Sequence, residues 1–136
     1  MTKRSGANVR ELLLFHGTAG QYVDPICQQG FDWRISGLSV GTLYGKGSYF
    51  AKNAHYSHKY TNDHRLFIVQ VLVGEFCAGH STYVRPPPKD YAEPFGATYD
   101  SCVDKVNNPE IFVIFSSDQA YPAYLIEYEP VFTTKV

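Results

Sequence analysis

The sequence has few of the features that mark secreted, membrane-spanning or metal-binding proteins. Its 136 residues include only three cysteines, without CxxC or Cys/His ligand spacing, and an odd number cannot close a complete disulfide framework. The N-terminus lacks the apolar segment of a signal peptide, and no apolar run approaches the roughly 20 residues of a membrane span. We therefore expect a protein of a reducing compartment, cytoplasmic or nuclear, with neither membrane association nor a metal ion.

An excess of charge of either sign is also lacking. Twelve Lys and Arg residues against 13 Asp and Glu give a net charge of -1, without a basic cluster, so we expect no direct binding of nucleic acid by this domain. What the chain does have is 44% hydrophobic residues, enough to fill the core of one compact domain. We expect residues 1–136 to form that single domain.

Hydrophobic patterning predicts strands at residues 11–15, 66–73, 111–115 and 123–128, and a brief strand or a turn at residues 48–51. Two short helices are predicted early in the chain, from Tyr22 to Gly30 and from an N-cap at Asn53 to about Tyr60. The glycine-rich segment 36–47 and the segment from Pro86 to about Val106 are expected to be loops. Because most strands come late and do not alternate with helices, the pattern indicates an α+β fold.

Common nucleotide-binding and hydrolase motifs do not fit. The glycines between Gly41 and Ser48 resemble a P-loop, but Val40 and Gly47 stand where that motif needs Gly and Ser or Thr. No GxGxxG follows a predicted strand, and no GxSxG marks a nucleophile.

The sequence does resemble one family, in segments that occur in the family's order between about residues 11 and 129. The segments are Leu14-Phe15-His16-Gly17-Thr18, Tyr44 to Ala51, Tyr56-Ser57, Tyr99 to Val103, Ile111 to Phe115 and Gln119 to Pro122. Together they resemble the poly(ADP-ribose) polymerase family of ADP-ribosyltransferases, most closely its mono-ADP-ribosylating members with CCCH zinc fingers.

The resemblance implies the ADP-ribosyltransferase fold, with mostly antiparallel strands in two packed sheets and short flanking helices. The family's domain usually begins upstream with a strand and a helix, which we expect this chain to lack, and residues 1–10 are expected to be flexible.

The resemblance also implies a catalytic triad of His, Tyr and Glu. His16 and Tyr49 occupy the first two positions, but Ile111 stands at the third. Glu110 is a candidate substitute. Because successive side chains of a strand point to opposite faces, we expect Glu110 to face away from the site unless a bulge turns it.

The family's known site implies the roles of the remaining residues toward NAD, the expected substrate. The backbone of Gly17 and the hydroxyl of Ser57 would hold the nicotinamide carboxamide, and Tyr60 would stack on its ring. Tyr49 would pack against the ribose, and His16 would bond a ribose hydroxyl with Thr18 alongside.

Catalysis in the family needs no metal. The bond between nicotinamide and ribose breaks through a cationic transition state that resembles that of glycoside hydrolysis. Without the triad glutamate, the expected activity is transfer of a single ADP-ribose from NAD to a protein, possible self-modification included. The alternative is a domain that has kept the fold but not the activity.

Overall fold

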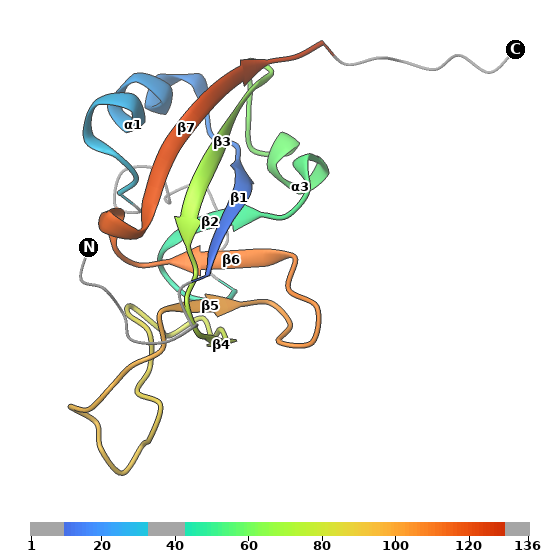
Figure 1. Cartoon of the computed structure of the whole chain (residues 1–136). Helices are drawn as coiled ribbons and strands as arrows, with labels where there is room; N and C mark the ends of the chain where they lie inside the picture. The colour runs from blue at the N-terminus through green and yellow to red at the C-terminus, as the bar shows by residue number, and fades with distance from the viewer. Residues whose placement is uncertain (1–9, 33–42, 130–136) are drawn as a thin grey trace, which may run out of the picture.

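Seven strands form one mixed sheet in the computed structural model, which describes residues 10–32 and 43–129 (Figure 1). The strands are β1 (Glu11–His16), β2 (Ser48–Ala51), β3 (Arg65–Leu72), β4 (Phe76–Ala78), β5 (Ser101–Val103), β6 (Ile111–Ile114) and β7 (Ala120–Glu127). They are ordered β4-β5-β6-β2-β1-β3-β7. The pairs are antiparallel apart from β4 with β5, so the expected α+β class with mostly antiparallel strands is confirmed.

The sheet consists of two groups of strands that cross at a steep angle in Figure 1. The long strands β1, β3 and β7 form one group, and the short strands β2, β6, β5 and β4 form the other. A single register pair, Phe15 with Ala51, joins β1 to β2. The expectation of two packed sheets is therefore corrected in one respect: backbone pairing across this seam makes the two groups one continuous sheet.

The helical segments are short. They are the 3-10 turn η1 (Gly20–Tyr22), α1 (Val23–Gln29), α3 (Ala54–His58) and the 3-10 turn η3 (Ser117–Gln119). The Asn53 side chain caps α3 by accepting a hydrogen bond of 3.3 Å from the Tyr56 amide, as predicted, although the helix ends at His58 rather than near Tyr60. No helix in the described part of the chain is long and apolar enough to cross a membrane.

Two groups of buried side chains fill the two faces of the sheet. The main core contains Leu14, Val23, Ile26, Phe31, Phe50, Phe67, Val69, Val71, Val73, Val103, Phe112, Ile114 and Ala120. A smaller cluster contains Tyr49, Cys102 and Val113. Because Tyr49 and Phe50 are neighbours in β2, their side chains point to opposite faces, and this separates the two clusters.

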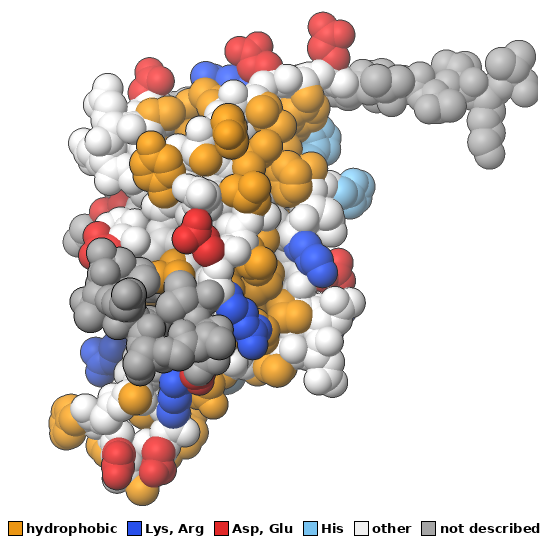
Figure 2. Space-filling model, viewed as in Figure 1, with side chains coloured by type: hydrophobic (Ala, Val, Ile, Leu, Met, Phe, Trp, Pro, Cys, Tyr) orange, Lys and Arg blue, Asp and Glu red, His pale blue; other side chains and the backbone are white. Residues whose placement is uncertain are grey.

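Apolar side chains also gather on the surface over β7 (Figure 2). Tyr121, Tyr124 and Leu125 of β7 are exposed, as is Leu13 of β1. The core therefore does not use all the apolar surface that the long strands provide.

The strands β4 and β5 were not predicted. Each has only three residues, too few for hydrophobic periodicity to show, and β5 lies within the segment predicted as a loop. Ser101 is nevertheless fully buried, because its hydroxyl donates a 2.8 Å hydrogen bond to the Val73 carbonyl. Most of the predicted glycine-rich loop, residues 36–42, lies outside the described residues.

Candidate functional site

The end of β1 lies directly against α3. A Cβ atom added to Gly17 would lie 1.9 Å from the backbone carbonyl oxygen of Ser57, a distance at which no side chain fits. Ser57 is 2% exposed, and its carbonyl oxygen accepts a 3.1 Å hydrogen bond from the Tyr60 amide. This contact brings three of the predicted nicotinamide-binding residues into one place.

His16 is buried and held in one orientation. Its Nδ1 lies 2.7 Å from the backbone carbonyl oxygen of Tyr49, and its ring packs edge-on against Phe31 and tilted against Phe50. Since a carbonyl oxygen only accepts hydrogen bonds, Nδ1 carries a proton. Burial lowers the pKa of His16 to about 4, despite the opposing effect of the Tyr49 carbonyl, so the ring is neutral at pH 7.

The other ring nitrogen of His16 has no partner. In a neutral imidazole with its proton on Nδ1, Nε2 is a hydrogen-bond acceptor. Among the described residues, it is the one buried side-chain nitrogen or oxygen without a hydrogen bond. An unpaired buried acceptor costs about 1–3 kcal/mol, so this atom is suited to a ligand that brings a hydroxyl group.

The buried imidazole makes stability depend on pH. The unfolded chain takes up a proton at this histidine near pH 6.5, whereas the folded protein does so only near pH 4. The contribution of His16 to the free energy of unfolding is therefore complete above pH 6.5 and falls by about 3 kcal/mol as the pH drops toward 4. Urea unfolding across this pH range should show a steeper loss of stability in the wild type than in His16→Gln. Parallel curves of stability against pH would contradict the assignment of this loss to His16.

The Tyr49 ring points away from His16. Its hydroxyl donates a 2.8 Å hydrogen bond to the Gly45 carbonyl and accepts one of 3.0 Å from the Tyr44 amide. Burial raises the pKa of Tyr49, so the phenol is neutral. Because the ring packs with Cys102 on the face opposite Phe50, the first two triad positions meet only through the Tyr49 backbone carbonyl.

Tyr60 lies next to Tyr56 beyond the end of α3. The two rings are 5.3 Å apart and inclined at 56°, and the Tyr60 hydroxyl donates a 3.3 Å hydrogen bond to that of Tyr56. Burial and this hydrogen bond raise the pKa of Tyr56. Tyr56 thus contacts the tyrosine that is expected to stack on nicotinamide.

Ile111 begins β6, opposite Ala51 of β2. Glu110 directly precedes the strand, where its backbone carbonyl accepts a 2.9 Å hydrogen bond from the Lys52 amide. Both Glu110 and Ile111 border a pocket of about 250 Å³ beside α3. That Glu110 faces away from position 111 stays a prediction. Its carboxylate lies 3.4 Å from the Lys105 ammonium group and is half exposed.

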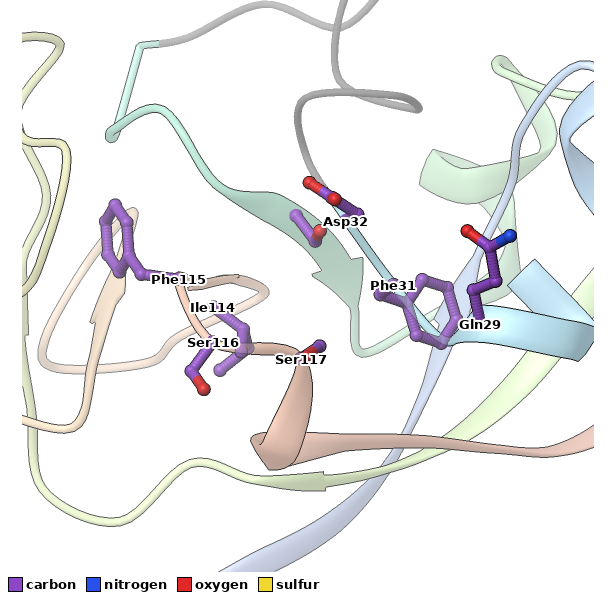
Figure 3. Close-up of a pocket in the computed structure, with 8 residues that line it drawn as sticks. Gln29, Phe31, Asp32, Ile114, Phe115, Ser116 and Ser117 are labelled. Carbon is purple, nitrogen blue, oxygen red and sulfur yellow. The ribbon is translucent and has the colours of Figure 1, made fainter. Parts of the chain in front are cut away.

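A second pocket, of about 470 Å³, lies between the end of α1 and the end of β6 (Figure 3). Gln29, Phe31, Asp32, Ser48 and residues 114–117 line it. None of the predicted site residues does so. Phe31 connects it to the site, because the same ring packs on His16. The function of Phe31 could not be predicted from the sequence, in which it is only an apolar residue after the helix-ending Gly30.

The predicted residues therefore fall into two sets. His16, Gly17, Ser57 and the nearby buried Thr18 lie around the end of β1, whereas Tyr49 and Ile111 lie on the other group of strands. No group of three or more potential metal ligands occurs among the described residues.

Comparison with known proteins shows which family the chain resembles. Residues 2–130 match the family described as the poly(ADP-ribose) polymerase catalytic domain. The chain is 52% identical over 130 residues to the mouse protein mono-ADP-ribosyltransferase PARP12 and 53% identical over 133 residues to the human one. These matches cover 93% and 94% of the chain but only 18% of each relative.

A more distant relative gives the same result. The human protein mono-ADP-ribosyltransferase PARP11 is 39% identical over 150 residues, which cover 93% of the chain and 44% of that protein. The chain thus spans less than half the length of each of these relatives. On the match over residues 2–130, the chain belongs to the poly(ADP-ribose) polymerase catalytic domain family.

Proposed function

We propose that this domain is an NAD-dependent protein mono-ADP-ribosyltransferase, which transfers one ADP-ribose from NAD to a protein side chain and releases nicotinamide. The observation that carries the proposal is the buried, neutral His16, whose Nδ1 is held by the Tyr49 carbonyl and whose Nε2 is an unpaired acceptor. A ribose hydroxyl supplies the donor that Nε2 lacks. The mono-ADP-ribosyltransferase names of the relatives support the same activity.

The contact between β1 and α3 is suited to hold nicotinamide. Backbone groups of Gly17 and the hydroxyl of Ser57 are complementary to a carboxamide, which both donates and accepts hydrogen bonds. The nearby Tyr60 ring offers an aromatic surface, and stacking adds about 0.5–1.5 kcal/mol beyond the buried area. Fixing nicotinamide while the ribose moves lets positioning supply much of the rate.

The isoleucine at the third triad position limits the product. Ile111 has no group that can bond a ribose hydroxyl or accept its proton, so a ribose of an attached ADP-ribose is not activated as the next acceptor. A carboxylate of a target protein is already a nucleophile and needs no base. We therefore propose acidic side chains as acceptors and a single ADP-ribose as the product.

Intact-mass spectrometry after incubation with NAD tests this function. We expect masses that increase by whole ADP-ribose units, each on a separate side chain, and a loss of this increase in Tyr60→Ala. Tyr124→Ala, which removes an exposed tyrosine far from α3 in the sequence, is the matched control and should behave as the wild type. Stabilisation by nicotinamide without any mass increase would instead show a domain that binds but does not transfer.

Glu110→Gln tests whether the neighbouring carboxylate replaces the missing glutamate. Because Glu110 pairs with Lys105 at the surface, we expect the variant to retain the wild-type transfer rate in the same assay. A large loss of transfer, with normal thermal stability, would assign the triad role to Glu110. Long ladders of product on a gel would contradict the proposal of single transfer.

A further inference from the structure

A row of four side chains crosses the short strands and ends at Tyr49. In register, Cys77 of β4 lies opposite Cys102 of β5, Cys102 lies opposite Val113 of β6, and Val113 lies opposite Tyr49 of β2. Residues directly opposite each other on neighbouring strands point to the same face of a sheet. The two cysteines therefore share a face with Tyr49, and Cys102 and Tyr49 belong to the same buried cluster.

The two thiols are close enough to react with each other. Their sulfur atoms are 3.9 Å apart, and both cysteines are free. Neighbouring strands lie about 4.8 Å apart, within the range of Cα separations that a disulfide spans, and its sulfur atoms must approach to about 2.05 Å. A rotation of the two side chains supplies this approach without separating the strands.

The different burial of the two cysteines determines which thiol is oxidised first. Cys77 is half-buried, whereas Cys102 is fully buried, so a reagent in solution meets Cys77 first. Burial raises the pKa of Cys77 and raises that of Cys102 to about 12, so both are protonated thiols at neutral pH. Reaction is consequently slow, and it depends on the proximity of Cys102 rather than on an activated thiolate.

We propose that Cys77 and Cys102 form a site of reversible oxidation, which closes to a disulfide and changes the packing of Tyr49. With glutathione disulfide as oxidant, the Cys77 sulfur attacks one glutathione sulfur, forms a mixed disulfide and releases one glutathione thiol. The Cys102 sulfur then attacks the Cys77 sulfur and releases the second. Two protein thiols and one glutathione disulfide thus become one protein disulfide and two glutathione thiols.

The link to Tyr49 is the shared cluster. Cys102 and Val113 pack with the Tyr49 ring, and the hydroxyl of this ring holds Tyr44 and Gly45. The disulfide draws the Cys102 sulfur toward Cys77. The packing beside Tyr49 therefore loosens, while the chain between residues 77 and 102 becomes a closed loop.

The test uses a Cys27→Ser variant, because this substitution removes the exposed third cysteine from the reaction. The variant is oxidised with glutathione disulfide. We expect a mass lower by two hydrogen atoms and a Cys77–Cys102 cross-linked peptide, both reversed by a reducing agent. Two matched variants are compared. The reaction of Cys102→Ser should stop at the glutathione adduct on Cys77, and Cys77→Ser should react far more slowly. A stable adduct on Cys77 with Cys102 intact would overturn the proposal.

The effect on Tyr49 needs its own readout. In protein labelled with ¹³C-tyrosine, the ring signal of Tyr49, assigned by its absence in Tyr49→Phe, should shift on oxidation and return on reduction. The signal of Tyr124 should stay in place. If the disulfide forms and the Tyr49 signal does not move, the coupling is refuted. Because neither experiment uses NAD, both outcomes are independent of the proposed transfer activity.

Discussion

Gly17→Ala is expected to lose more than about 4 kcal/mol of stability, and with it nicotinamide-dependent stabilisation of the fold. The added methyl group would lie 1.9 Å from the Ser57 carbonyl oxygen and 2.8 Å from its carbonyl carbon. Both are backbone atoms, which no rotation of a side chain can remove, so β1 and α3 must separate. Since a domain of this kind is stable by about 5–15 kcal/mol, the loss takes a large part of the total.

The measurement is the urea midpoint and slope of the variant, with Gly96→Ala as the control. A methyl group at Gly96 would lie 3.1 Å from the backbone carbonyl oxygen of Glu93, against 1.9 Å for the contact at Gly17, so a small local shift relieves it and we expect only a small change. If the urea midpoint of Gly17→Ala equals that of the wild type within experimental error, the close contact of β1 with α3 is not needed for folding.

His16→Asn is expected to weaken binding of NAD by about 1–3 kcal/mol, or roughly 5- to 150-fold, while the domain stays folded. An asparagine amide group can replace Nδ1 as donor to the Tyr49 carbonyl but places nothing at the position of Nε2. A ribose hydroxyl buried there then has no acceptor. Isothermal titration with a non-hydrolysable NAD analogue measures the loss apart from any chemical step.

His16→Gln separates this role from a structural one. Its longer side chain carries an acceptor to the position of Nε2, so we expect it to retain more affinity than His16→Asn, with similar thermal stability. If the two variants bind equally well, Nε2 does not contact the ligand. If both unfold, the packing of the imidazole among Phe31, Phe50 and Phe67 is its main role.

The long strands and both helices could be predicted because their apolar residues repeat over enough of the chain. The cap at Asn53 and the strand at residues 111–114 follow from such local patterns. The short strands β4 and β5 could not be predicted, since partners far apart in the sequence decide them. The same limit applies at the start of β6, because the pairing of Ile111 with Ala51 could not be predicted from local patterns.

The site shows the same division. His16 and Gly17 could be identified from a local segment, but the burial that leaves His16 neutral depends on Phe31 and Phe67, which are distant in sequence. Nor does the sequence reveal that Cys77 and Cys102, 25 residues apart, have sulfur atoms 3.9 Å apart.

The seam between the two groups of strands has a mechanical consequence. One register pair, Phe15 with Ala51, joins them, and α3 contacts β1 and β3 on one side and β2 on the other. His16 and Gly17 belong to the first group, and Tyr49 and Ile111 belong to the second. A dinucleotide held by both groups of strands would restrict their motion relative to each other at this seam. Its arrival should therefore slow amide hydrogen exchange along β1 and β2 more than in either outer strand.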